Sequence, residues 1–191
     1  MLKLKYCLSI ALFFAIVLSS ATDDFNKKGS QTTDQIPAIL TSLIDGTPFT
    51  ADTLRGKMIV INFWASYHAE SRMNSYLLVN LANSYKEQSF FNGNGLQVVS
   101  ISLDRYKSPL KRAIEIDGTQ AFYHICDYLG AESSLVKSFN ITQPINLLVD
   151  GNGQIIARDF EVKEIEQTLK LMVQNWNLII FEKKRWEIAL N

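Results

Sequence analysis

Residues 58–78, MIVINFWASYHAESRMNSYLL, decide the fold class of this chain. The stretch opens with an apolar run, Met58–Trp64, and continues through a short polar turn, Ala65–Ala69. It ends in a segment whose apolar residues have the spacing of a helix face. A strand that leads through a turn into a helix brings free backbone N–H groups and the positive end of the helix dipole together. The stretch therefore predicts a buried strand with a functional site at the start of the next helix.

The helix expected over Glu70–Gln88 carries apolar residues at intervals of three and four. They are Met73, Leu77, Leu78, Leu81 and Tyr85. This spacing predicts one buried face. Two polar residues, His68 and Ser71, stand at the helix start. Glu70, between them, is expected to point away along the helix.

The rest of the folded region alternates strand-like and helix-like segments. An N-terminal hairpin is expected first, with a strand in Ala38–Leu43, a turn at Asp45-Gly46 and a return strand at Pro48-Phe49. Further strands are expected at Leu96–Leu103, Phe122–Ile125, Ile145–Val149 and Gln154–Arg158, and further helices at 109–116, 132–139 and 162–176. This alternation predicts an α/β fold in which helices cover both faces of a central mixed sheet.

Composition and charge limit the function classes. The chain has 191 residues, of which 47% are hydrophobic and 20% charged, as in an ordinary globular protein, and one domain is the default. The part after Ala21 holds 17 basic and 19 acidic residues, a net charge of −2. This balance gives no reason to expect a nucleic-acid partner.

Met1–Ala21 has the pattern of a secretory signal peptide. Lys3 and Lys5 form its basic start, Leu8–Leu18 its apolar core, and small residues precede the expected cleavage site after Ala21. The apolar core is shorter than the roughly 20 residues of a spanning helix. We expect export to the periplasm or cell envelope. The alternative is an uncleaved segment that anchors the protein in the membrane.

The remaining boundaries follow from composition. Residues 22–35 are polar and predict a flexible lead-in, residues 36–175 form the folded domain, and residues 176–191 form a C-terminal extension. Removal of the signal, which contains Cys7, would leave Cys126 as the only thiol, so no intramolecular disulfide is expected. Trp176–Phe181 is strongly apolar. We expect it either to pack on the sheet or helix flank, or to form an exposed patch for a partner or a membrane surface.

Two motifs resemble one known family. Phe63-Trp64-Ala65-Ser66, followed by Arg72, resembles the active-site motif F-W-A-x-W-C-x-x-C-R of the TlpA/ResA-like branch of the thioredoxin superfamily, which are envelope thiol–disulfide oxidoreductases. Residues 139–150, FNITQPINLLVD, resemble the family's second anchor, Y-x-V-x-x-x-P-T-x-F-L-I-D. The resemblance covers about residues 36–175 and implies a thioredoxin-like fold with an N-terminal β-hairpin.

The resemblance breaks at the residues that carry the family's chemistry. His68 and Ser71 occupy the positions of the two motif cysteines. Thiol–disulfide exchange needs an attacking thiolate and a second thiol, and neither residue can form a disulfide. Tyr67, Asn74 and Tyr76 also depart from the family pattern. We therefore predict no catalytic residue, no cofactor and no metal, and a site that has left dithiol chemistry.

Pro144 matches the proline that follows a cis peptide bond beside the family's motif. The backbone of the preceding residue, here Gln143, would pair with an extended peptide in the manner of strand addition. The alternative is that Pro144 serves only the turn. The resemblance thus implies a groove for an extended peptide or an envelope protein, made by Trp64, Tyr67, His68, Ser71, Gln143 and Pro144.

Other chemistries remain as alternatives to a non-catalytic binding module. Cys126 would act as a redox-active single thiol only if it is exposed with a low pKa, and is otherwise a partly buried structural residue. His68 would serve as a general base for Ser71 or as a metal ligand, although the sequence places no orienting acid. The neighbouring His124 also suggests a metal. Such sites need three or four ligands, and the chain has only two histidines.

Overall fold

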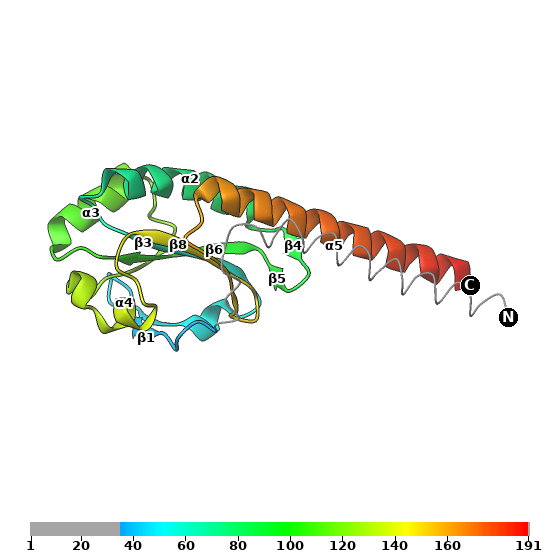
Figure 1. Ribbon diagram of the computed structural model, residues 1–191, viewed down its shortest axis with the longest axis horizontal. Helices are drawn as coiled ribbons and strands as arrows, with labels where there is room; N and C mark the ends of the chain where they lie inside the picture. Colours follow the sequence, from blue (N-terminus) through cyan, green and yellow to red (C-terminus); the bar gives the residue numbers. More distant parts are fainter. Residues whose placement is uncertain (1–34, 191) are drawn as a thin grey trace. The chain divides into compact units, whose positions relative to one another are not determined.

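The computed structural model describes residues 35–190, with side chains over residues 35–185, so the predicted signal segment and nearly all of the lead-in lie outside it. Five strands form the central sheet in the order β7-β6-β3-β8-β9 (Figure 1). Their bounds are β3 Met58–Trp64, β6 Leu96–Ser102, β7 Tyr123–Ile125, β8 Ile145–Val149 and β9 Ile155–Arg158. Strands β3, β6 and β7 are parallel, whereas β8 runs antiparallel to β3 and β9. The mixed sheet of the predicted α/β class is confirmed.

Strand β3 is the centre of this sheet. All of its residues are buried, and it pairs with β6 along its full length and with β8 over residues 59–63. A strand with neighbours on both sides and layers on both faces needs a nearly continuous apolar run, which is what the sequence supplies. The C-terminal end of β3 leads into the loop that carries the candidate site.

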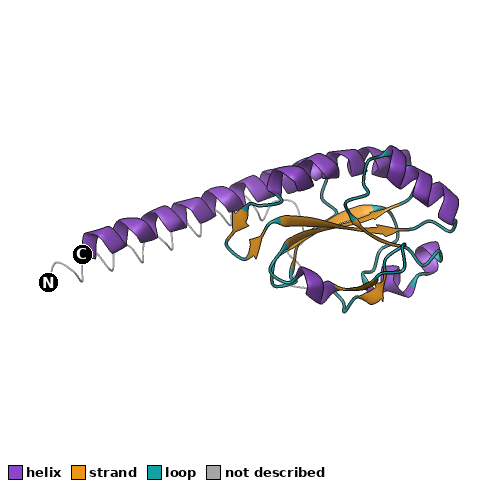
Figure 2. Ribbon diagram, turned by 180° about the vertical axis from the view of Figure 1, so that it is seen from behind, coloured by secondary structure: helices purple, strands orange, loops and turns teal. Residues whose placement is uncertain are grey.

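The two faces of the sheet carry different layers (Figure 2). One face is covered by three helices, α2 (Ala69–Tyr85), α3 (Lys107–Ile116) and α5 (Val162–Leu190). The other is covered by the hairpin β1 (Leu40–Ser42) and β2 (Pro48–Thr50), the short helices η1 (Ala51–Leu54) and η2 (Gly130–Glu132), and α4 (Ser134–Ser138). The predicted N-terminal hairpin and the coverage of both faces are confirmed.

A second small hairpin, β4 (Ser89–Phe90) and β5 (Gly93–Asn94), follows α2. Gly95, which ends it, has φ +74°, and a Cβ there would lie 2.3 Å from the Lys86 carbonyl oxygen. Only glycine fits such a position without a backbone shift. This glycine returns the chain into β6.

The buried face of α2 differs from the predicted one. Met73 is 72% exposed and Leu77 is 47% exposed, so their assignment to the core is wrong. The residues that face the sheet are Ser71, Ser75, Leu78, Leu81 and Tyr85. Ser75 lies three residues before Leu78, and Ser71 lies four residues before Ser75, so all three share one helix face. A search for apolar residues alone does not find the two serines. The face of α2 is therefore polar where it approaches the site.

Helix α5 is longer than predicted. It continues beyond Trp176 to Leu190, because its sequence contains no glycine or proline that would end it. Val162, Ile165 and Leu169 are buried on the sheet, but no described side chain from Leu171 onward is buried.

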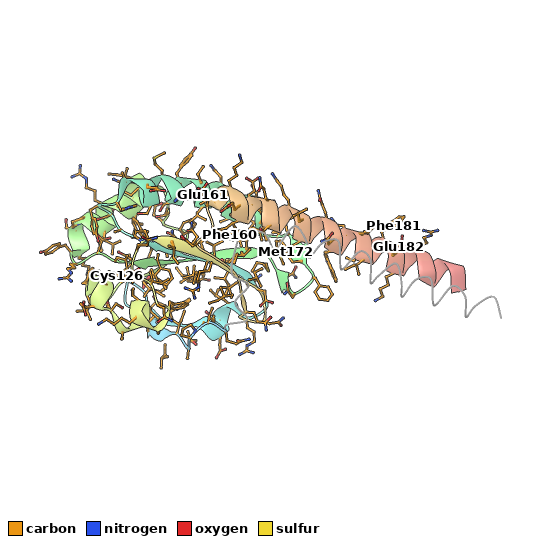
Figure 3. All side chains as sticks on the ribbon, viewed as in Figure 1. Cys126, Phe160, Glu161, Met172, Phe181 and Glu182 are labelled. Carbon is orange, nitrogen blue, oxygen red and sulfur yellow. The ribbon has the colours of Figure 1, made fainter. Side chains whose placement is uncertain are left out.

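The apolar part of the extension is correspondingly exposed. Leu178 is 49% exposed and Phe181 is 63% exposed, so packing of these two residues on the domain is not observed. Figure 3 shows Phe181 on the C-terminal part of α5. Trp176 meets the Phe91 ring edge-on, with ring centroids 5.9 Å apart. No helix within residues 35–190 is both long and apolar enough to cross a membrane.

Candidate functional site

A buried carboxylate holds the loop between β3 and α2. Asp104, just after β6, accepts hydrogen bonds from the Ser66 backbone N–H at 2.9 Å, the Ser66 hydroxyl at 2.5 Å and the Ser102 hydroxyl at 2.7 Å. Three donors satisfy this carboxylate, which is only 2% exposed. The sequence pattern did not single out Asp104, which lies just after the predicted strand Leu96–Leu103, yet its hydrogen bonds fix the turn that presents His68.

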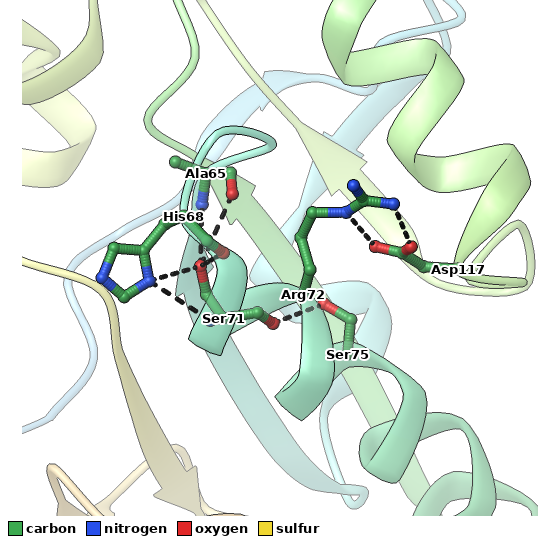
Figure 4. A network of polar contacts seen from close by, with 6 residues as sticks. All are labelled: Ala65, His68, Ser71, Arg72, Ser75 and Asp117. Carbon is green, nitrogen blue, oxygen red and sulfur yellow. Dashed lines mark hydrogen bonds and ion pairs between the residues drawn. The ribbon is translucent and has the colours of Figure 1, made fainter.

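His68 is the N-cap of α2 (Figure 4). Its Nδ1 accepts a hydrogen bond from the Ser71 backbone N–H at 3.2 Å and lies 3.1 Å from the Ser71 hydroxyl. A backbone N–H can only donate, so in this geometry Nδ1 is the acceptor and Nε2 of the neutral ring carries the proton. The ring thus takes the part that a Ser, Thr, Asp or Asn side chain usually takes at a helix start.

Ser71 is 3% exposed, and its hydroxyl donates to the His68 carbonyl oxygen at 3.0 Å. A hydrolytic pair would need the histidine to receive the serine proton while an acid orients the ring. Glu70 lines the same pocket as His68, contrary to the prediction that it points away, because side chains of a first helical turn tilt toward the N-terminus. Among the described contacts it makes no hydrogen bond to His68 or Ser71. The pair therefore caps the helix and is not arranged as a nucleophile with its base.

A pocket of about 230 Å³ opens beside this cap. It joins the start of α2 to the segment before β8, so that His68, Ser71, Gln143 and Pro144 share it. The other lining residues are Asn62, Phe63, Glu70, Asn74, Ile145, Asn146 and Asp159. The structure thus brings together four of the residues that the resemblance implied for a groove.

The two remaining groove candidates lie elsewhere. Trp64 is 1% exposed and packs against three residues of α3, so it does not line the pocket. These residues are Leu110, Ala113 and Ile114. Trp64 is the last residue of β3 and lies on the face covered by α3, where the apolar cluster excludes solvent. Tyr67 is 76% exposed on the loop and also lies outside the pocket lining. Direct contact of Trp64 with a ligand is therefore excluded in this arrangement.

The peptide bond before Pro144 is trans, as are all peptide bonds of the described chain. The cis bond that the resemblance implied is therefore a wrong prediction. The trans form is favoured intrinsically by about 0.5–1 kcal/mol for a bond to proline. Pro144 is half-buried and Gln143 is exposed, and both still line the pocket.

Two buried asparagines form the floor of the pocket. Asn62 Nδ2 donates to Asn146 Oδ1 at 2.9 Å, and Asn146 Nδ2 donates to the Phe160 carbonyl oxygen at 3.0 Å. Because a carbonyl oxygen can only accept, this chain of bonds fixes the orientation of both amides. It leaves Asn62 Oδ1 buried with no hydrogen-bond partner among the described residues.

Sequence reasoning missed both asparagines as site residues. Each sits inside an otherwise apolar strand, in VINFW and INLLV. A polar amide within a strand that is buried on both faces was the available signal, because buried amides need specific partners.

The Arg72 side chain extends away from His68 toward Asp117 (Figure 4). Its guanidinium holds Asp117 through two bonds, from Nε at 2.9 Å and from Nη2 at 2.5 Å. The bond to Asp117 raises the pKa of Arg72. This bidentate pair ties α2 to the end of α3. Arg72 is therefore not among the residues that line the pocket.

Cys126 and His124 lie on the β7 side of the sheet. The half-buried Cys126 donates from Sγ to the Asp104 carbonyl oxygen at 3.4 Å, and burial raises the pKa of its thiol. His124 is buried and bonds through Nε2 to the Thr119 carbonyl oxygen at 2.8 Å. Over residues 35–185 no three His, Cys, Asp or Glu side chains gather as metal ligands do. The thiol environment is opposite to the exposed, low-pKa one that a reactive cysteine needs.

Comparison with known proteins places this geometry in a family. No family model matches the chain, and no curated protein matches it. Among solved structures, a thioredoxin-like protein from Parabacteroides distasonis is 30% identical, with a TM-score of 0.51 over 60% of this chain and 81% of that one.

Two further structures cover more of the chain. A thiol-disulfide oxidoreductase from Bacteroides fragilis is 26% identical, with a TM-score of 0.63 over 72% of this chain and 98% of that one. The thioredoxin domain of a thiol-disulfide oxidoreductase from Bacteroides vulgatus is 23% identical, with a TM-score of 0.65 over 74% and 97%. The fold, the order of its elements and these similarities agree: this chain belongs to the thioredoxin superfamily.

Proposed function

We propose that this protein is an exported, TlpA/ResA-like member of the superfamily that has lost dithiol chemistry and binds an extended polypeptide. The binding site is the pocket between the turn at residues 65–72 and Pro144. One observation carries the proposal. The two residues in place of the motif cysteines, His68 and Ser71, are engaged with each other as a helix cap at the rim of a pocket that Gln143 and Pro144 complete.

The backbone beside the pocket supports strand addition. Gln143 precedes β8 and forms no backbone hydrogen bond to another described residue. Its N–H and C=O therefore remain available to an extended chain, which gains affinity through main-chain hydrogen bonds in this mode of recognition. Asn74, which also lines the pocket, offers an amide group to side chains of the bound segment.

The alternative, a redox protein that acts through Cys126, gains no support from the thiol's surroundings. Its Sγ is bonded to a backbone carbonyl oxygen, and burial raises its pKa, which lowers the fraction of reactive thiolate. A disulfide-reduction assay on the native chain, on Cys126→Ser and on the double variant His68→Cys/Ser71→Cys separates the two functions. We expect activity only in the double variant. Native activity that disappears in Cys126→Ser would overturn the proposal.

Binding is tested with reduced, carboxymethylated lactalbumin, an unfolded polypeptide without free thiols. Gln143→Pro removes the backbone N–H and is expected to weaken binding about tenfold, because the strand-addition bond is lost. Gln143→Ala keeps that N–H and serves as the matched control with nearly native affinity. Equal affinity of the native chain and Gln143→Pro, with unchanged thermal stability, would contradict binding at this segment.

A further inference from the structure

We propose that the pocket selects a lysine or arginine side chain of the bound polypeptide, held between the carboxylates of Glu70 and Asp159. The inference rests on the proposed peptide binding and adds the chemistry of the ligand. The charged side chains that line the pocket are all acidic.

Two exposed acidic residues from separate elements line the pocket. Glu70 comes from the first turn of α2, and Asp159 follows β9, where its backbone N–H donates to the Asn146 carbonyl oxygen at 2.9 Å. Neither carboxylate forms an ion pair with a described residue. No lysine or arginine lines the pocket. A cation that enters therefore meets two uncompensated acceptors.

Arg72 and Arg158, which are adjacent in sequence to pocket residues, are engaged in other contacts. Arg72 is bound to Asp117 on the far side of α2. Arg158, adjacent to Asp159 in sequence, donates from Nη1 to the Phe139 carbonyl oxygen at 3.1 Å. Both guanidinium groups are thus held by fixed partners. They do not neutralise the two carboxylates of the pocket.

Helix dipoles oppose this negative field only in part. Helices α2 and α5 both begin beside the pocket, and each N-terminus is equivalent to about half a positive charge. Together they offset about one of the two pocket carboxylates. At the start of α5, the Glu164 carboxylate already accepts the Glu161 backbone N–H at 3.0 Å. The net charge around the pocket therefore remains negative and favours a cation over an anion.

The floor of the pocket, made by Asn62 and Asn146, also favours a cation. Asn62 is 2% exposed, and the bonding order of the two amides leaves its Oδ1 as an unpartnered acceptor. Because this oxygen is buried, it contributes negative potential beneath the pocket rather than the first contact with a ligand. An approaching ammonium or guanidinium group is thus attracted by the rim and by the floor.

The test uses the full chain and four fluorescein-labelled peptides, Ser-Gly-Ser-X-Ser-Gly-Ser, with Lys, Arg, norleucine or Glu at X. Fluorescence anisotropy is measured at low and at moderate salt. We expect the Lys and Arg peptides to bind about fivefold more tightly than the norleucine peptide, as two partly exposed ion pairs would give, and salt to reduce the difference. The double variant Glu70→Gln/Asp159→Asn should reduce it below about twofold.

Glu87→Gln is the matched control, because Glu87 is an exposed carboxylate just beyond the other end of α2. It should leave the discrimination unchanged. Equal binding of the Lys and norleucine peptides, or tightest binding of the Glu peptide, would overturn selection of a cation. If the unfolded polypeptide binds and none of the peptides does, selection by one basic side chain fails while the proposed binding function stands. If the polypeptide also fails to bind, the proposed function falls with it.

Discussion

The two ends of helix α2 lie on the same sheet but meet different surfaces. Toward its C-terminus the buried residues are apolar and pack on apolar strand residues. Toward its N-terminus the buried residues are serines, and the sheet beneath them is polar. The apolar end comprises Leu78, Leu81 and Tyr85 over Met58, Val60, Val98 and Leu148. The buried polar residues are Ser71 and Ser75 on α2, and Asn62, Ser100 and Asn146 on the strands.

The strand register explains the polar end. Asn62 pairs with Ser100 on one side and with Asn146 on the other, and Ser100 pairs with His124. These four residues form one row across four strands, and all four are buried. Burying polar groups costs free energy unless they are hydrogen-bonded, so such a row adds little to cohesion. One end of this layer therefore holds the domain together, whereas the other shapes the pocket.

The largest effect is expected at the apolar end. Leu78 is fully buried, and Leu78→Ala should lower the free energy of unfolding by about 2–5 kcal/mol through lost burial and the cavity left behind. Met73, on the same helix, is 72% exposed, so Met73→Ala should change the free energy of unfolding by less than about 0.5 kcal/mol. Urea titrations of both variants measure the difference. If Leu78→Ala and Met73→Ala lower the free energy of unfolding equally, α2 is rotated relative to the sheet.

A smaller effect is expected at the polar end, where His68 caps the helix. His68→Ala removes the acceptor of the Ser71 N–H and should cost about 1 kcal/mol in urea titrations. His68→Asn supplies another capping acceptor and should retain most of the stability. If both variants are as stable as the native chain, the cap does not hold in solution.

The apolar end was more predictable from the sequence than the polar end. The run Met58–Trp64 is largely apolar because both faces of β3 are buried. Such a run predicts a central strand of the sheet. The serines of α2 carry no such signal, and the apolar spacing pointed to Met73 and Leu77 instead. Buried small polar residues are recognised only once the surface opposite them is known.

The candidate site was predictable only where a motif marked it. His68, Ser71, Gln143 and Pro144 follow from the two motif anchors, and the structure places all four in one pocket. The floor depends on the register of β3 with β8, which sets Asn62 opposite Asn146 and which local sequence does not encode. Asp159 reaches the pocket from beyond β9 for the same long-range reason.

The smallest expected effect tests the far end of the polar row by pH. Burial lowers the pKa of His124 below its ordinary value of about 6.5. Between that value and the lower folded-state pKa, the unfolded chain binds more protons than the folded one. The free energy of unfolding is therefore fully retained above about pH 6.5 and falls as the pH drops below it. Between pH 7 and pH 6 the loss should be less than about 1 kcal/mol, because at most one proton is taken up.

Urea titrations at the two pH values measure this loss. His124→Gln should remove the fall in stability between pH 7 and pH 6, whereas Met73→Ala, a change at an exposed side chain, should retain it. If His124→Gln keeps the fall, the pH dependence does not come from the buried histidine of the polar row. The row would then shape the pocket without contributing to the response of the domain to acid.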